Sequence, residues 1–276
     1  MAYQQALLEG CGLQVTDTGG DGHPVVLMHG WPLSSEAWEA QLGALSSAGY
    51  RAIAYDRRGF GQSKKPETGY GYNVLTDDLA ALVDEMNLRE FSLVGFSMGG
   101  GEAARYPARY SGSRLRGVVF ASAVPPYLMK SDDNPDGPLP PDVFEGMREA
   151  VSNDPSGFYE QFSRNFFSVD GEMKTSEEER QKALRLCAQA KQVAVEQTMD
   201  AWANTDFRAD LDTICRPVLV IHGDSDSIVP FEGSGELTAK RVDKAQTHII
   251  KGGPHGINTT HADEFNEVLI DFLNKL

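Results

Sequence analysis

In Phe91-Ser92-Leu93-Val94-Gly95-Phe96-Ser97-Met98-Gly99, a short apolar run leads directly into a Gly-x-Ser-x-Gly motif. Two more glycines and a helical pattern follow. This order predicts a strand, a sharp turn and a helix, with Ser97 at the turn. Such a turn lifts the serine hydroxyl above the sheet edge, at a helix N-terminus where amide dipoles favour developing negative charge. Because the motif also arises by chance, other parts of the chain have to support this interpretation.

Strand and helix patterns alternate along most of the chain. Continuous apolar runs, such as residues 25–28, are typical of strands buried on both faces. The first two expected strands flank Gly10-Cys11-Gly12 and predict a hairpin. The alternation predicts an α/β fold with a mainly parallel sheet and right-handed crossovers. Besides the strand before Ser97, we expect strands at residues 4–9, 13–17, 25–28, 51–55, 117–121, 217–221 and 247–250.

Residues 125–205 interrupt this alternation, because no run typical of a strand appears in them. The segment opens with Pro125-Pro126 and a polar, proline-rich loop. We interpret it as a helical cap inserted after the sixth strand, with residues 1–124 and 206–276 forming the core. Ligands of open α/β sheets bind at the carboxyl ends of the strands, so such a cap would cover the site. Its helical patterns centre on residues 143–151, 158–167, 176–189 and 193–202.

Composition limits the classes of function. The 276 residues are enough for one large α/β domain with an insertion. A net charge of −15 argues against a nucleic acid as partner and is explained most simply by solubility. No signal peptide is apparent, and no apolar run approaches the ~20 residues that cross a bilayer, so we expect no membrane association. The three cysteines are Cys11, Cys187 and Cys215. Their number and spacing fit neither a disulfide framework nor a zinc site, which favours a cytoplasmic protein.

A serine nucleophile needs a base and a group that orients the base. His255 lies in a glycine-rich loop, residues 252–256, between the last expected strand and the last helix. A loop at the carboxyl end of a parallel strand can project this side chain over Ser97, so we predict that His255 is the base. Three other histidines lack such a position and are expected to have structural or solvent roles: His23, His248 and His261.

The acid that orients the base is expected after the preceding strand. His222-Gly223-Asp224-Ser225-Asp226 follows the apolar run at residues 217–221. We prefer Asp226 and assign Asp224 to the turn, which is a common role of aspartate at such positions. The resulting order along the chain is Ser97, Asp226 and His255, as expected for an α/β-hydrolase.

An oxyanion hole requires two hydrogen-bond donors. We expect the backbone N–H of Met98, directly after the nucleophile, and that of Trp31, in the loop His29-Gly30-Trp31-Pro32. Pro32 pushes Trp31 towards an extended conformation and stiffens the loop. His29 could be catalytic, but a buried histidine that braces the loop through hydrogen bonds is the preferred interpretation.

The motifs closely resemble those of the cofactor-free bacterial haloperoxidases, a branch of the α/β-hydrolases that also contains esterases and perhydrolases. The resemblance covers nearly the whole chain and implies an eight-stranded sheet. Trp31 is one departure, since many chloroperoxidase-type members have phenylalanine there, and tryptophan should narrow the pocket. Pro107 is another and should end or kink the helix after Ser97. The motifs are His29–Ser34, Tyr55–Ser63, Gly95–Glu102, Ser122–Pro126, Asp132–Pro135, His222–Pro230 and Gly252–Gly256.

The resemblance implies acyl transfer without a metal, haem or other cofactor. Ser97, Asp226 and His255 would form the triad, with Trp31 and Met98 as oxyanion donors. Ser97 would take an acyl group from a small ester or short carboxylic acid. Water or hydrogen peroxide would then release it, and a peracid formed with peroxide would oxidise bromide or chloride. Relatives often assemble, so a homo-oligomer is compatible with the resemblance.

Aromatic and apolar residues are expected to line the acyl pocket. Phe158 and Phe162 have helical spacing, so they could equally pack the core of the cap. A plain carboxylesterase, lactonase or amidase is the close alternative, since the same triad serves both reactions. A non-catalytic ligand receptor is the alternative of another class. The expected pocket residues, besides Trp31 and Met98, are Phe96, Phe144, Phe158, Phe162 and Ile228.

Overall fold

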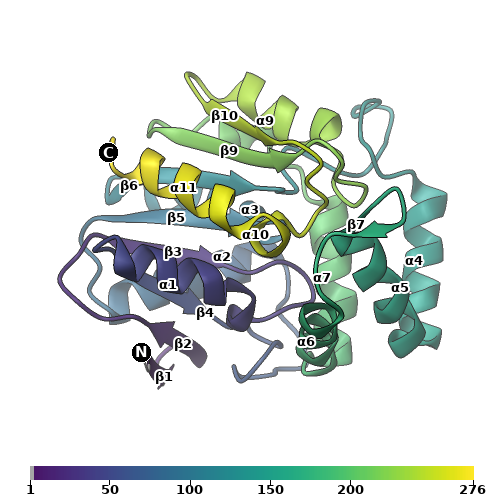
Figure 1. Ribbon diagram of the computed structural model, residues 1–276, viewed down its shortest axis with the longest axis horizontal. Helices are drawn as coiled ribbons and strands as arrows, with labels where there is room; N and C mark the ends of the chain where they lie inside the picture. Colours follow the sequence, from purple (N-terminus) through teal and green to yellow (C-terminus); the bar gives the residue numbers. More distant parts are fainter. Residues whose placement is uncertain (1–2) are drawn as a thin grey trace.

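The structure is a computed structural model that describes residues 3–276 of the chain. Figure 1 shows one central sheet with helices on both of its faces. A further group of helices, from residues 141–204, lies beyond one end of the strands. This is the end at which the parallel strands finish, so these helices cover the edge where the loops after the strands meet.

Eight strands form the central sheet. They are Gln4–Leu8 (β1), Leu13–Asp17 (β2), Pro24–Met28 (β3), Arg51–Tyr55 (β4), Phe91–Phe96 (β5), Leu115–Ala121 (β6), Val218–Gly223 (β9) and Gln246–Ile250 (β10). Their order is β1-β2-β4-β3-β5-β6-β9-β10. β2 pairs antiparallel with β1 and with β4, and all other neighbours pair parallel. The prediction of a mainly parallel, eight-stranded sheet is confirmed.

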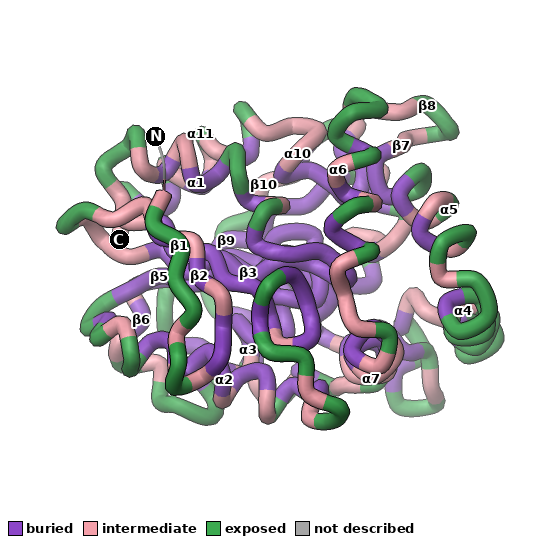
Figure 2. Tube along the Cα trace, turned by 90° about the horizontal axis from the view of Figure 1, so that it is seen from below, coloured by how far each residue is buried: buried purple, intermediate pink, exposed green. Residues whose placement is uncertain are grey.

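Burial follows position in the sheet. All six residues of β5 and all six of β9 are buried, because helices cover both faces of these inner strands. Figure 2 shows the inner strands as buried and the edge strand β1 as largely exposed. The core therefore consists of the two sides of the sheet and the helices that lie on them.

Helices flank the sheet on both faces (Figure 1). The longer ones are Glu39–Ser47 (α1), Tyr72–Glu85 (α2), Gly99–Tyr110 (α3), Gly235–Arg241 (α9) and Ala262–Leu273 (α11). The short ones are Ser35–Trp38 (η1), Arg208–Leu211 (α8), Phe231–Gly233 (η2) and Ile257–Thr260 (α10). Pro107 does not end α3, which continues to Tyr110. The proline lies in the last turns of the helix, where only one backbone hydrogen bond is lost. No helix within residues 3–276 has the length and apolar character that a membrane crossing requires.

Four helices form the group beyond the strand ends: Pro141–Asn153 (α4), Pro155–Phe167 (α5), Glu177–Ala188 (α6) and Gln192–Asn204 (α7). The expectation of no strand in this segment needs one correction. Ser168–Val169 (β7) and Glu172–Met173 (β8) form a small antiparallel hairpin. Two-residue strands around Asp170-Gly171 are too short to give an alternating pattern in the sequence.

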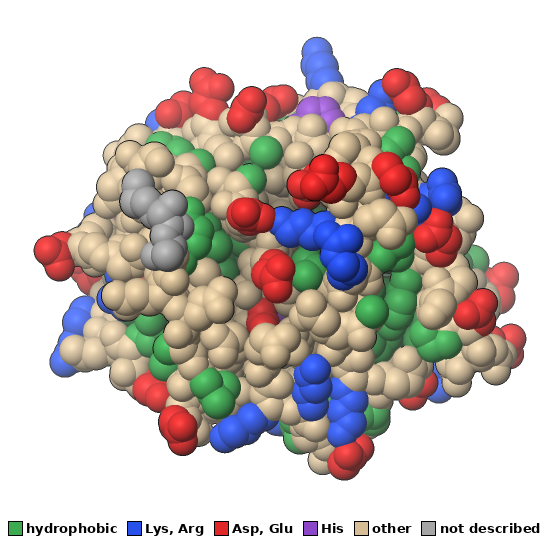
Figure 3. All heavy atoms as spheres, turned by 60° about the horizontal axis from the view of Figure 1, so that its bottom comes forward, with side chains coloured by type: hydrophobic (Ala, Val, Ile, Leu, Met, Phe, Trp, Pro, Cys, Tyr) green, Lys and Arg blue, Asp and Glu red, His purple; other side chains and the backbone are tan. Residues whose placement is uncertain are grey.

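The surface mixes the two signs of charge. Figure 3 shows acidic side chains lying among basic ones, with hydrophobic side chains in separate patches. No continuous basic strip appears among the described residues of this face. The net charge of −15 is therefore not gathered into one acidic block on the face shown.

The turn at Ser97 depends on close contacts of glycine. The backbone of Ser97 has a φ of +53°, in the left-handed region that residues other than glycine rarely adopt. A Cβ atom on Gly95 would overlap the backbone of Gly99, and one on Gly99 would overlap the carbonyl oxygen of Met28. The N-terminus of α3 thus lies directly against β5 and β3, which holds the strained turn in place.

We predict that Gly99→Ala destabilises the protein by about 1–3 kcal/mol, because the methyl group meets backbone that cannot move aside. Gly146→Ala is the matched control, since Gly146 lies inside α4 with no atom within 4 Å of its added Cβ. It should be neutral or stabilising by about 0.5–1 kcal/mol. Denaturant unfolding measures both. Equal effects of the two substitutions would contradict this account of the turn.

Candidate active site

Three side chains from different strand ends form a hydrogen-bonded chain. Ser97 lies between β5 and α3, Asp226 follows β9, and His255 follows β10. The Nε2 atom of His255 is 2.9 Å from the Ser97 Oγ, and its Nδ1 atom is 2.7 Å from the Asp226 Oδ2. All three residues are buried, with exposed fractions of 7%, 6% and 1% for Ser97, Asp226 and His255. The structure thus brings together the three residues that the sequence singled out.

The surroundings of Asp226 keep its carboxyl group ionised. The backbone N–H groups of Ile228 and Val229 donate to its Oδ1, at 3.0 and 2.8 Å. Burial on its own would raise the pKa of Asp226, but His255 and His222 next to it hold that pKa well below its usual range. A carboxylate only accepts hydrogen bonds, so His255 must carry its proton on Nδ1. Its Nε2 atom is then free to accept the proton of the Ser97 hydroxyl.

His222 is a neighbour of the acid that the sequence pattern did not indicate. Its Nε2 atom lies 2.8 Å from the Val229 carbonyl oxygen and 3.4 Å from the Asp226 Oδ2. The fully buried ring thus supports the loop that carries Asp226. Because His222 lies near the end of the buried strand β9, its sequence position could have indicated that its ring is buried close to Asp226.

Asp224 occupies the turn, as expected. Its Oδ1 atom accepts the N–H of Gly252 at 2.7 Å and the hydroxyl of Ser225 at 3.0 Å. It is exposed and joins the loop after β9 to the loop after β10. Asp226, not Asp224, is therefore the carboxylate within reach of His255.

The two expected oxyanion donors flank Ser97. Within residues 3–276, neither the N–H of Trp31 nor that of Met98 donates to a backbone or side-chain acceptor. Buried N–H groups without a partner are rare, so both are suited to bind an incoming oxygen. The Trp31 indole donates to the Val195 carbonyl oxygen of α7 at 3.0 Å, and Tyr72 donates to the Met98 carbonyl oxygen at 2.8 Å.

A small apolar cavity adjoins the serine. Its volume is about 60 Å³, and among residues 3–276 Ser97 is the one residue that brings a hydroxyl group to its wall, beside the indole rings of Trp31 and Trp202. The loop between β6 and α4 contributes four of its residues, namely Val124, Leu128, Pro138 and Leu139. This loop folds back on itself, and the N–H of Leu139 donates to the Leu128 carbonyl oxygen at 3.0 Å. The wall comprises Trp31, Ser97, Met98, Val124, Leu128, Pro138, Leu139, Met147, Phe162, Trp202, Ile228 and Val229.

Two of the five further predicted pocket residues line this cavity, namely Phe162 and Ile228. The other three predicted residues are not on the wall of this cavity, and their rings contact neighbouring aromatic side chains. The Phe96 ring lies 5.2 Å from that of His255, between centroids. The Phe144 ring lies edge-on to that of Trp202 at 6.3 Å between centroids, and the Phe158 ring stacks on that of Phe162 at 5.7 Å.

The C-terminal end of α5 holds the loop of His255. The N–H of Gly256 donates to the Phe166 carbonyl oxygen at 2.9 Å, and the Phe166 ring lies edge-on to His255 at 5.0 Å. A Cβ on Gly256 would lie 2.7 Å from the rings of Phe166 and Phe167. The helices beyond the sheet therefore contact the histidine loop directly.

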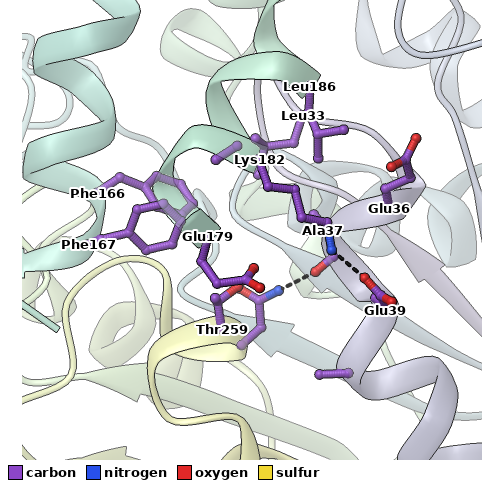
Figure 4. A pocket seen from close by; sticks show the side chains of 13 residues that line it. Leu33, Glu36, Ala37, Glu39, Phe166, Phe167, Glu179, Lys182, Leu186 and Thr259 are labelled. Atoms are coloured by element: carbon purple, nitrogen blue, oxygen red, sulfur yellow. Dashed lines mark hydrogen bonds and ion pairs between the residues drawn. The ribbon is translucent and has the colours of Figure 1, made fainter. Parts of the chain in front are cut away.

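A second cavity, of about 380 Å³, is lined in part by Phe166 and Phe167 (Figure 4). Its walls come from η1, α1, α5, α6 and α10. Lys182 and Glu39 form an ion pair beside it, and Asn258 donates to the Ala37 carbonyl oxygen at 2.8 Å. Phe166 therefore lines this cavity and also contacts His255.

Comparisons with known proteins agree with this geometry. The family model described as alpha/beta hydrolase fold matches residues 23–262. The chain belongs to the α/β-hydrolase family. It is 40% identical over 259 residues to a non-heme chloroperoxidase of Kitasatospora aureofaciens, with 93% of this chain and 94% of that protein covered. It is 36% identical to a bifunctional esterase/perhydrolase of Acinetobacter calcoaceticus, with 96% and 97% covered.

A solved structure gives the same result. The crystal structure of a bromoperoxidase from Bacillus anthracis superimposes with a TM-score of 0.94 at 46% identity, covering 99% of each chain. This α/β-hydrolase is thus an enzyme of the haloperoxidase branch, as the sequence motifs indicated. Among residues 3–276, no three His, Cys, Asp or Glu side chains gather in a way that could hold a metal ion.

We predict that Asp226→Asn lowers stability in a pH-dependent way. The pKa of Asp226 is lowered on folding, so its ionisation stabilises the protein above the ordinary carboxyl pKa, near 4. This contribution is lost as the pH falls through the lowered pKa. The free energy of unfolding should therefore fall by about 2 kcal/mol in the variant at pH 7.

The difference between the two proteins should then shrink as the pH falls below about 4. Denaturant unfolding at a series of pH values, down to the lowest at which both proteins fold, measures it. A difference that stays constant with pH would show that the carboxylate is not stabilised in this way.

Proposed function

We propose that Ser97 is the nucleophile of an acyl-transfer reaction, with His255 as general base and Asp226 as the group that orients it. The observation that supports this most is the continuous chain from the Ser97 Oγ through His255 to the ionised Asp226. The unpartnered N–H groups of Trp31 and Met98 would bind the oxygen of the reacting acyl group.

The reaction proceeds in two halves. His255 takes the hydroxyl proton as the Ser97 oxygen attacks the acyl carbonyl, and then gives that proton to the leaving group. In the second half, water or hydrogen peroxide accepts the acyl group and loses a proton to His255 as it attacks the acyl-enzyme. Ser97 regains its proton, and a carboxylic acid or a peracid leaves. A peracid formed in this way transfers one oxygen, with its proton, to chloride or bromide in solution, leaving the carboxylate and a hypohalous acid.

The cavity beside Ser97 favours a short acyl group. About 60 Å³ of apolar space leaves room for few carbon atoms and gives a charged group no partner. We propose that the substrate is a small ester or a short carboxylic acid, and that residues 125–205 act as a cap over it. Hydrolysis alone is the second candidate, and the relative named as both esterase and perhydrolase supports testing the two together.

We predict that the protein hydrolyses a nitrophenyl acetate and, in acetate buffer with peroxide and a chelator, halogenates a dye. Ser97→Ala should abolish both activities, because the two share one acyl-enzyme. Ser227→Ala is the control, since Ser227 is exposed and next to Asp226. Both activities are measured on the same preparations.

Several results would contradict the proposal. Halogenation that persists in Ser97→Ala would rule out the peracid route. Loss of halogenation on chelation would demonstrate a metal requirement. A wild-type protein without either activity would favour a non-catalytic receptor.

A further inference from the structure

A buried ion pair that the triad does not use lies behind the oxyanion loop. Arg57, after β4, binds Glu102 of α3 through its Nε atom at 2.9 Å and through Nη2. The exposed fractions of Arg57 and Glu102 are 1% and 0%, and Tyr55 donates to the other Glu102 oxygen at 2.6 Å. Removing two charges from water is costly, so this pair has to be held by several hydrogen bonds.

Arg57 determines where His29 carries its proton. The backbone N–H of Arg57 donates to the His29 Nε2 atom at 3.0 Å, so that nitrogen is unprotonated. Burial and the charge of Arg57 lower the pKa of His29 well below its usual range, so the ring is neutral. The single ring proton is therefore on Nδ1, which is 2.9 Å from the Gly30 carbonyl oxygen and donates to it. The Nη1 atom of Arg57 also lies 3.2 Å from this Nδ1 atom, but both atoms then carry protons, so this contact is not a hydrogen bond.

The Gly30 carbonyl belongs to the same peptide group as the Trp31 N–H. In a trans peptide these two groups point in opposite directions, so a bond that fixes the carbonyl also aims the N–H. The Gly30 oxygen is held by the His29 ring and by the N–H of Leu33 at 3.0 Å. Fixing this carbonyl therefore fixes the direction of the first oxyanion donor.

The second oxyanion donor is fixed in a similar way, but by backbone alone. The Ser97 carbonyl oxygen accepts the N–H groups of Gly100 and Val124, at 3.0 and 3.2 Å. It shares its peptide group with the Met98 N–H. Glu102 lies in the first turn of α3, the helix that begins after Met98, so its bond to Arg57 connects the segments that carry the two donor peptides.

We propose that His29, set as the neutral Nδ1–H form by the Arg57–Glu102 pair, is a positioning residue for the oxyanion hole. Its Nδ1–H holds the Gly30 carbonyl and thereby directs the Trp31 N–H towards the oxygen of the reacting acyl group. This inference rests on the proposed function, because it assumes a tetrahedral adduct on Ser97.

Two substitutions of His29 test the proposal. The amide nitrogen of His29→Asn can take the place of Nδ1–H and still donate to the Gly30 carbonyl, whereas His29→Gln places its polar atoms at the level of Nε2. Propylboronic acid is the probe, since it forms a tetrahedral anion on the serine. Its Ki is measured together with kcat and KM for nitrophenyl acetate, per active site titrated with an organophosphate.

We expect His29→Gln to lower kcat about 10- to 100-fold and to raise the boronate Ki by a similar factor, with KM nearly unchanged. His29→Asn should recover most of this loss. If His29 had a purely structural role, its substitution would reduce the number of titrated active sites without changing the boronate Ki. Equal loss in both variants, or no loss in either, would overturn the proposal.

A second pair of variants tests the ion pair. Glu102→Gln should raise the boronate Ki in the same way as His29→Gln. Asp78→Asn is its control, because Asp78 pairs with the adjacent Arg58 but has no hydrogen bond to the oxyanion loop. It should leave Ki unchanged, and a raised Ki in Asp78→Asn alone would overturn the assignment. If the wild-type protein neither binds the boronate nor turns over the ester, the proposed function itself has failed.

Discussion

The close contact of helix α3 with strands β5 and β3 is the constraint on which the site depends. Gly95 and Gly99 allow this contact, since a Cβ on either would overlap backbone. It forces Ser97 into a left-handed conformation that an ordinary turn would not maintain. The hydroxyl is therefore presented above the sheet edge, and the Met98 N–H lies beside it. Everything else at the site is arranged around a serine whose backbone cannot relax.

Buried carboxylates organise the loops that surround this serine. Asp226, after β9, accepts the N–H groups of Ile228 and Val229, and Asp56, after β4, accepts those of Ser35 and Gln62 at 2.8 and 2.7 Å. In both cases backbone donors compensate for the loss of water around the charge. The loops are thus fixed before any ligand arrives, which is the preorganisation that stabilisation of a developing charge requires.

Much of this could be predicted from the sequence, because it depends on local pattern. Continuous apolar runs gave the inner strands, and the loops that follow them placed Ser97, Asp226 and His255 at one edge of the sheet. The pocket wall was predicted only in part. Leu128 and Leu139 reach the pocket wall because an irregular loop folds back on itself. The Phe96 ring lies against His255 instead of on this wall. Neither arrangement produces a periodic pattern in the sequence from which it could be predicted. The hydrogen bonds between His29, Arg57 and Glu102 could not be predicted either, because they join three segments that are far apart in the sequence.

The central claim is that Ser97 becomes acylated during turnover. Rapid mixing with nitrophenyl acetate, quenching in acid and mass spectrometry of the digested protein test it most directly. The account predicts one acetyl group on the peptide that contains Ser97, formed at least as fast as the overall turnover and removed faster when peroxide is added. Turnover without an acetylated Ser97, or with the acetyl group on another residue, would contradict it.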